Sequence, residues 1–158
     1  MIPDRIRSLL VRAQPWAADA AALLARLTIG QAFALAGLGK LRNLDRTGEF
    51  FASLGIPAPG VHAVAIGGLE LVGGCVLVLG LATRPAAFLL LGTMAVAILT
   101  AHRGEFAGAL AIAPDTGLTD VVPWMFAIIL LPLLAHGGGR LAIDRLLCRH
   151  PCAAAASP

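Results

Sequence analysis

The sequence predicts an all-α protein, a four-helix transmembrane bundle with a short amphipathic helix in its first external connection. Of its 158 residues, 58% are hydrophobic and 13% are charged, whereas soluble proteins have about 45–50% apolar and about 25% charged residues. The apolar residues also gather into four segments, at about residues 20–38, 61–80, 86–101 and 121–136. A helix needs about 20 apolar residues to cross the hydrocarbon of a bilayer, so each segment is a candidate span.

These four segments define a membrane domain of residues 20–147, preceded by a cytoplasmic N-terminal segment, 1–19, and followed by a tail, 148–158, that we expect to be disordered. The third and fourth segments are short for spans, and we expect them to extend into their flanks. Pro123 and Pro132 in the fourth segment are tolerable because neighbouring helices can satisfy the freed carbonyl groups.

The connection between the first two spans predicts a short helix. Asn43 or Asp45 could cap it, and Leu44, Phe50, Phe51 and Leu54 recur at roughly helical spacing before a Gly55 and proline stop. The helix could lie flat on the membrane with both phenylalanines in the headgroup boundary, or pack as a lid over the bundle.

The basic residues predict the orientation. With four spans, one side carries seven of them (Arg5, Arg7, Arg12, Arg84, Arg140, Arg145 and Arg149) and the other carries four (Lys40, Arg42, Arg46 and Arg103). The positive-inside rule then places both termini in the cytoplasm. The alternative is a signal peptide cleaved at Ala34-Leu35-Ala36. The scattered arginines and the net charge of +3 do not predict a nucleic-acid partner.

Glu70 is the one acid inside the second segment, about 15 Å from either interface. A carboxylate facing lipid at this depth costs about 2.5–3.5 kcal/mol, so we expect it to face the bundle interior, pair with a cation or take up a proton. Gly67, Gly73 and Gly74 share its helix face, and small residues in this arrangement mark helix–helix contacts in membranes.

Arg26 lies on a similar face of the first segment, with Gly30, Ala34 and Gly37. We therefore predict a contact between Arg26 and Glu70, directly or through water. The alternatives are that Arg26 reaches the headgroups, or that the pair only registers the two helices.

A second group of polar residues is expected at the outer interface, where Lys40 closes the first segment and His102 and Glu105 follow the third. The candidate polar site is therefore Arg26, Glu70, Lys40, His102 and Glu105. His102, Lys40 and Glu105 could line an outward-opening part of it for a polar headgroup or a quinone ring, although ordinary polarity at a helix end explains these three residues as well.

No catalytic motif or metal site is predicted, and no covalently bound cofactor is expected. Cys75 is expected to be a small packing residue. Cys148 and Cys152 flank Arg149, His150 and Pro151 in the tail, and this spacing is a weak signal for metal or redox chemistry.

The order of several short motifs over about residues 22–147 resembles the DoxX family of small membrane proteins. The motifs are Arg26-Leu27-x-x-Gly30, Ala36-Gly37-Leu38-Gly39-Lys40-Leu41, Phe51-x-x-Leu54-Gly55-Ile56-Pro57-x-Pro59, Glu70-x-x-Gly73-Gly74, Leu79-Gly80-Leu81-x-Thr83-Arg84 and Gly137-Gly138-Gly139-Arg140-Leu141-x-x-Asp144. The resemblance implies a four-helix inner-membrane bundle in which Arg26, Lys40 and Glu70 are the characteristic polar positions, and Arg84 and Asp144 mark helix ends.

The resemblance also implies membrane subunits of redox enzymes, since members of this family include those of a thiosulfate:quinone oxidoreductase. The first expectation for this chain is therefore the membrane subunit or anchor of a quinone-linked or thiol-linked redox complex, with a soluble or membrane redox partner. The others are a proton or small-solute carrier that uses Glu70, and a purely structural or chaperoning membrane protein. The oligomeric state stays open.

Overall fold

The computed structural model describes residues 4–111 and 117–147, with side chains described from residue 14 to residue 145 outside that gap. All regular structure in this part of the chain is helical. The helices are α1 (Asp4–Arg42), α2 (Leu44–Ser53), α3 (Pro59–Leu79), α4 (Thr83–Thr100), α5 (Arg103–Leu110), α6 (Val122–His136) and α7 (Ile143–Leu147). The predicted all-α fold is confirmed. The predicted tail, including Cys148 and Cys152, lies outside the described residues.

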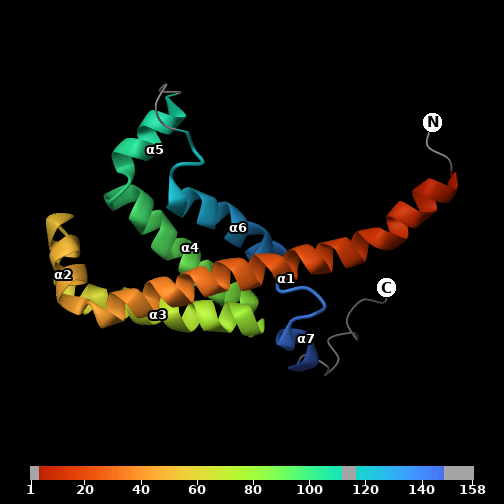
Figure 1. Cartoon of the computed structure of the whole chain (residues 1–158), viewed down its shortest axis with the longest axis horizontal. Helices are drawn as coiled ribbons and strands as arrows, with labels where there is room; N and C mark the ends of the chain where they lie inside the picture. The colour runs from red at the N-terminus through yellow and green to blue at the C-terminus, as the bar shows by residue number, and fades with distance from the viewer. Residues whose placement is uncertain (1–3, 112–116, 148–158) are drawn as a thin grey trace, which may run out of the picture.

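The four apolar helices form two packed pairs (Figure 1). α1 runs alongside α3, and α4 pairs with α6 and crosses the first pair. All four helices contribute to one apolar core, whose members are Ile29, Phe33, Leu77, Ala86, Ala87, Leu90, Met94, Leu130 and Leu133. The four-helix bundle that the apolar segments predict is therefore the fold.

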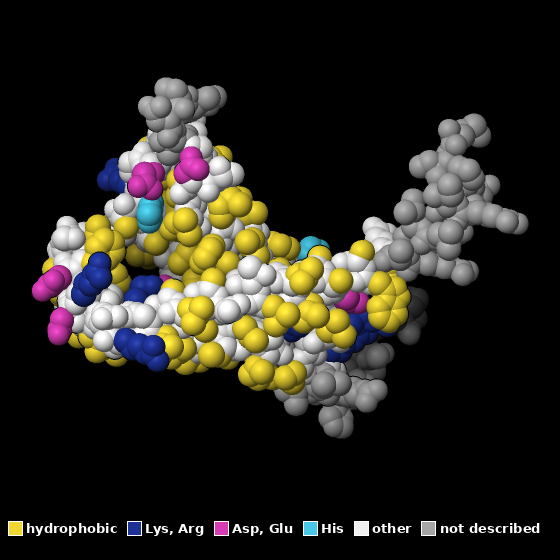
Figure 2. Space-filling view, in the orientation of Figure 1, with side chains coloured by type: hydrophobic (Ala, Val, Ile, Leu, Met, Phe, Trp, Pro, Cys, Tyr) yellow, Lys and Arg dark blue, Asp and Glu magenta, His cyan; other side chains and the backbone are white. Residues whose placement is uncertain are grey.

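Large apolar side chains also cover the outside of the bundle, as Figure 2 shows along α1, α4 and α6. Among them are Leu24, Val72, Phe88, Leu99 and Leu131, all at least half exposed. A soluble protein rarely leaves so much apolar surface uncovered. Three helices, Gln14–Arg42 within α1, α3 and α4, are long and apolar enough to span a bilayer, and α6 is a shorter apolar helix of 15 residues. The protein is a membrane protein.

The first helix is longer than its predicted span of residues 20–38. α1 has 39 residues and is therefore about 58 Å long, well beyond the roughly 30 Å of hydrocarbon. The N-terminal segment thus continues the same helix instead of preceding it. The boundary between this segment and the membrane domain stays a prediction.

The connection between α1 and α3 contains the expected amphipathic helix, α2, which begins directly after Asn43. The Asn43 side chain does not cap it, because its amide donates to the Gly39 carbonyl at 3.0 Å instead. α2 packs on α3, with Phe51 buried and Phe50 exposed. The buried Phe51 therefore agrees with the lid alternative, in which α2 packs on the bundle, while the exposed Phe50 can contact the headgroup boundary.

Candidate functional site

Glu70 lies inside the bundle, on the face of α3 that contacts other helices. It is only 3% exposed. A Cβ on Gly74 would lie 2.5 Å from the Gly30 carbonyl oxygen of α1, and one on Gly73 would lie 3.2 Å from the Leu90 side chain of α4. Gly74 thus lets the α1 backbone come close, and Gly73 leaves room for the Leu90 side chain of α4. The predicted inward orientation of Glu70 is correct.

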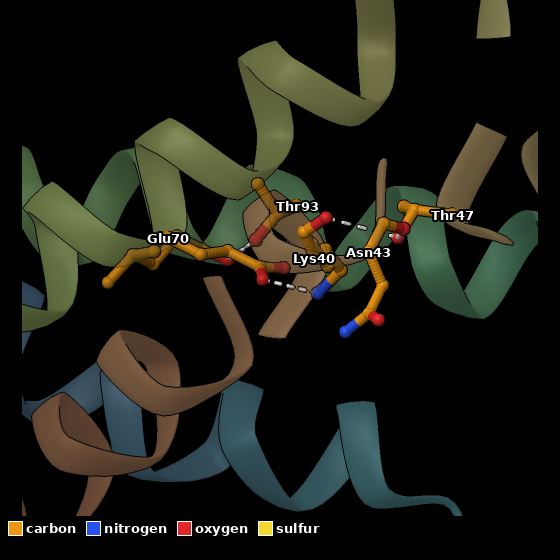
Figure 3. A network of polar contacts seen from close by, with 6 residues as sticks. Lys40, Asn43, Thr47, Glu70 and Thr93 are labelled. Atoms are coloured by element: carbon orange, nitrogen blue, oxygen red, sulfur yellow. Dashed lines mark hydrogen bonds and ion pairs between the residues drawn. The ribbon is translucent and has the colours of Figure 1, made fainter. Parts of the chain in front are cut away.

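The partner of Glu70 is Lys40. The Lys40 ammonium group donates to Glu70 Oε2 in a direct ion pair between α1 and α3, shown in Figure 3. The Lys40 side chain is 28% exposed and that of Glu70 is 4% exposed. The acid is therefore enclosed, whereas the cation keeps one side open.

The open side of Lys40 faces a small pocket at the end of α1. The pocket has a volume of about 370 Å³ and is lined by Gly39, Lys40, Asn43, Arg46, Thr47 and Phe50. The Thr47 hydroxyl donates to the Asn43 carbonyl oxygen at 2.8 Å, which ties the start of α2 to the end of α1. The pocket is thus mostly polar and lies beside an aromatic ring.

A hydroxyl group from α4 completes the surroundings of the pair. Gly73 faces Leu90, and continuing this antiparallel register by one helical turn places Glu70 level with Thr93. Figure 3 shows Thr93 on this side of the pair. Thr93 is buried, and its hydroxyl donates to the Leu90 carbonyl at 2.8 Å.

The predicted contact between Arg26 and Glu70 is wrong, and the register of α1 on α3 explains why. Gly30 faces Gly74 and Gly37 faces Gly67, so Glu70 lies level with the α1 turn at Gly37. Arg26 is about ten residues, or about 15 Å, from that level, whereas Lys40 is one turn away. Helical side chains also lean toward the N-terminus of their helix. Lys40 and Glu70 therefore lean toward each other, and Arg26 leans away.

Arg26 is instead buried at the opposite end of the bundle, with 1% exposure. It donates to the Leu141 carbonyl at 3.2 Å. Its guanidinium occupies the space that a side chain at Gly80 would need. Gly80 has a φ of +70°, so both space and backbone conformation require glycine where α3 ends. Arg26 therefore joins the end of α3 to the segment that contains Leu141, and it is not part of the Glu70 site.

Asp144 joins the same end from the far end of the chain. Its carboxylate accepts hydrogen bonds from Thr83 N at 2.9 Å, from the Thr83 hydroxyl at 3.1 Å and from Ala82 N at 2.5 Å. Burial acts to raise the pKa of Asp144, but these hydrogen bonds and the nearby Arg26 charge together lower it below its ordinary value of 3.8. The carboxylate thus caps the start of α4 in its charged form.

The remaining predicted residues are placed elsewhere. His102 Nδ1 lies 2.7 Å from Glu105 Oε2, an exposed pair within the first turn of α5. Cys75 is exposed, so its expected packing role is wrong. It stands five positions after Glu70 and therefore points about 140° away from the buried face.

Within residues 4–111 and 117–147, no three His, Cys, Asp or Glu side chains are grouped to hold a metal ion.

Sequence reasoning missed Lys40 as the partner of Glu70. Part of the signal was present, because helical side chains lean toward the N-terminus of their helix and this favours the cation on the C-terminal side. The register of the two glycine faces, on which the choice also depends, comes from the packing of the helices. What the site can do chemically follows from its asymmetry. An ammonium group has three donors, and here one is committed to a carboxylate while the open side can donate to a ligand oxygen.

Comparisons with known proteins give relatives among membrane proteins. The sequence model of the DoxX family matches residues 21–103. The chain is 30% identical to "Inner membrane protein YphA" of Escherichia coli (strain K12) over 125 residues, covering 78% of this chain and 87% of that protein. It is 34% identical to "Uncharacterized membrane protein Rv3486" of Mycobacterium tuberculosis (strain ATCC 25618 / H37Rv) over 142 residues, covering 83% of each.

A further relative has a name that states an activity. The chain is 38% identical over 78 residues to the Bacillus subtilis (strain 168) protein named "Putative oxidoreductase CatD". The match covers 49% of this chain and 57% of that protein, so it spans little more than half of the relative. No solved structure matches this chain.

Proposed function

We propose that this chain, which belongs to the DoxX family, is the membrane subunit of a quinone-linked redox system and binds a quinone ring at Lys40. The observation that carries the proposal is the asymmetric ion pair, with Glu70 enclosed and Lys40 open to a pocket at one end of the apolar helices. A quinone dissolves in the bilayer and carries two carbonyl oxygens, which accept hydrogen bonds.

The chemistry of the pocket suits this ligand. The Lys40 ammonium is a charge-assisted donor, and hydrogen bonds to charged groups contribute about 1.5–3 kcal/mol. Asn43 and Thr47 line the same pocket as further polar groups, and the Phe50 ring offers an apolar wall. Glu70 holds the ammonium in place from the buried side. Electrons would come from a soluble or membrane redox partner, and the name of the Bacillus subtilis relative supports a redox setting.

The test is quinone binding by the purified full-length protein in lipid nanodiscs. A short-tail ubiquinone analogue is titrated against the wild type, Lys40→Gln and Glu70→Gln. Loss of one charge-assisted hydrogen bond corresponds to about a 10- to 100-fold weaker Kd, and we expect this for Lys40→Gln. Glu70→Gln should weaken binding less, because the donor remains and only its anchor is lost.

The matched control is Arg42→Gln. Arg42 is an exposed cation at the same end of α1 and does not line the pocket, so this variant should bind as the wild type does. Helical circular dichroism establishes that each variant is folded. Wild-type affinity in folded Lys40→Gln would refute the proposal.

A second candidate is a proton or small-cation carrier, favoured by the near-complete burial of Glu70 within a helix long enough to span a membrane. The discriminating measurement is flux into sealed vesicles under an imposed pH gradient. Flux that Glu70→Gln abolishes would place the carrier above the quinone subunit. Absence of flux at every gradient would remove the carrier.

We also propose that the protein lies in the inner membrane with both termini in the cytoplasm. In the fold, Arg84, Arg140 and Arg145 lie at the end of the bundle to which Arg26 and Asp144 belong. Labelling of single cysteines placed at Gly117 and Arg145 with an impermeant maleimide, in a variant whose native cysteines are replaced, tests this orientation. Labelling of the Arg145 position from outside intact cells would reverse it.

A further inference from the structure

A second polar pocket lies at the opposite end of the bundle from Lys40, where α6 ends and the chain turns toward α7. Its volume is about 600 Å³. Three arginines line it, Arg84, Arg140 and Arg145, together with His136 and the backbone of Gly137, Gly138 and Gly139. Figure 2 shows basic side chains gathered on this side, below the N-terminal half of α1.

Two carboxylates also line this pocket, but both are engaged by the protein itself. Asp19 Oδ1 accepts a hydrogen bond from the Arg140 backbone N at 2.8 Å, and Asp19 Oδ2 has no hydrogen-bond partner among the described residues but lies 3.8 Å from Arg140 Nε in an ion pair. Asp144 accepts from the backbone N atoms of Ala82 and Thr83. These bonds hold the loop and the α3–α4 turn in place. The three arginines outnumber the two acids, so the pocket carries a positive excess.

A buried cation lies directly below the floor of the pocket. A Cβ on Gly138 would come within 3.2 Å of Arg26 Nη1, so the guanidinium lies against the glycine backbone that lines the pocket. Nη1 and Nε of Arg26 are buried without a hydrogen-bond partner. The nearby Asp144 carboxylate offsets part of the Arg26 charge, but burial in low dielectric strengthens the action of the guanidinium on its immediate surroundings. Arg26 therefore adds to the attraction of an anion at this place.

An apolar groove continues from the pocket along the membrane-facing side of the bundle. It has a volume of about 680 Å³ and runs between α1 and α6. Its apolar lining includes Ala18, Ala21, Ala25, Ile128 and Pro132. It shares Asp19, His136, Gly137 and Gly139 with the basic pocket. The two spaces together form one amphiphilic site.

We propose that this site binds an anionic phospholipid, with the headgroup phosphate in the basic pocket and one acyl chain in the groove between α1 and α6. A free phosphate ion would leave the groove unused. A zwitterionic lipid would bring a cation toward three arginines. Trp16 marks the interface beside the pocket, since it is exposed and lies 5.3 Å below the Arg140 guanidinium. The site is at the other end of the bundle from Lys40, so the two proposals stand or fall separately.

The test is lipid binding to the full-length protein in detergent, followed by native mass spectrometry. The probes are phosphatidylglycerol and phosphatidylcholine with identical acyl chains. We expect tighter binding of phosphatidylglycerol. Each arginine near an anionic membrane contributes about a fivefold gain in binding, so the double variant Arg84→Gln/Arg145→Gln should lose roughly 30-fold.

The matched control is Arg42→Gln/Arg103→Gln, which removes two exposed arginines at the other end of the bundle. This control should keep the preference for phosphatidylglycerol. Equal binding of the two lipids by the wild type, or an equal loss in the control, would overturn the proposal. A thermal melt of each variant with helical circular dichroism separates lost binding from lost folding.

The groove is tested with Ala21→Phe, which fills it from α1, against Ala95→Phe on the exposed side of α4. We expect only the first to weaken phosphatidylglycerol binding. Glycerol phosphate, which has the headgroup and no acyl chain, should fail to compete at millimolar concentration. Full competition by glycerol phosphate, or equal binding by both phenylalanine variants, would reduce the site to a phosphate pocket and contradict the lipid assignment.

Discussion

Replacing Lys40 with methionine removes the cation from an enclosed ion pair and leaves Glu70 behind with a side chain that is 4% exposed. Removing one partner of a buried pair costs about 3–5 kcal/mol because the remaining charge is not compensated. Lys40 itself is 28% exposed, so water already screens one side of the pair, and we expect about 3 kcal/mol. By the scaling for soluble chains of this size, the melting temperature would fall by roughly 6–12 °C.

The reverse substitution should be much milder. In Glu70→Gln the lysine keeps a flexible stem and an open side, so its ammonium can turn into the pocket and toward water. We expect a loss of about 1 kcal/mol, as for a partly exposed pair. The double variant Lys40→Met/Glu70→Met removes both charges and should lie within about 1 kcal/mol of the wild type.

The assay is reversible unfolding in mixed detergent, followed by helical circular dichroism, with the three variants measured against the wild type. Equal losses for Lys40→Met and Glu70→Gln, within about 0.5 kcal/mol, would refute the asymmetry on which the site depends. The double variant also bears on function. If it is stable and retains physiological activity, the pair only registers α1 against α3 and the protein is a structural one.

Three further outcomes are expected in the same assay. Gly74→Ala should lower the free energy of unfolding by about 1–3 kcal/mol, because its Cβ would lie 2.5 Å from the Gly30 carbonyl oxygen. Gly92→Ala has open space around it and should be neutral or slightly stabilising. Equal stability of the two variants would contradict the close packing of α1 on α3. Gly80→Ala should lower the stability more than either of these variants, since the added Cβ would meet the Arg26 guanidinium and the residue would have to keep a φ of +70°. A wild-type melting temperature in Gly80→Ala would show that this turn is not packed as described. The folded-state pKa of Asp144 is depressed below 3.8, so its contribution to stability is complete above the unfolded pKa and is lost as the pH falls through the folded pKa. The free energy of unfolding should therefore drop below about pH 4, and this drop should be smaller in the Asp144→Asn variant. An equal drop in both proteins would show that the carboxylate does not stabilise the start of α4.

The amino-acid sequence determined the class of protein and the inward orientation of its buried acid. Four apolar segments require helices in a membrane, because no other local structure satisfies every backbone group in lipid. The glycines around Glu70 predicted a helix contact on that face, since a close approach of backbones needs residues without side chains. These conclusions depend on spacing along one helix, which can be read directly from the chain. The orientation across the membrane and the redox setting stay predictions.

Only the tertiary structure decided which charges meet. The sequence predicted Arg26 as the partner of Glu70, and the structure has Lys40 there instead. The choice depended on how α1 slides along α3, where a shift of about ten residues moves a side chain by about 15 Å. The capping of Thr83 by Asp144 joins residues 61 positions apart, and the basic pocket joins α1, the α3–α4 turn and the loop after α6. Such contacts are set by the packing of whole helices, because the pattern along a single helix says which face is buried and not what lies opposite.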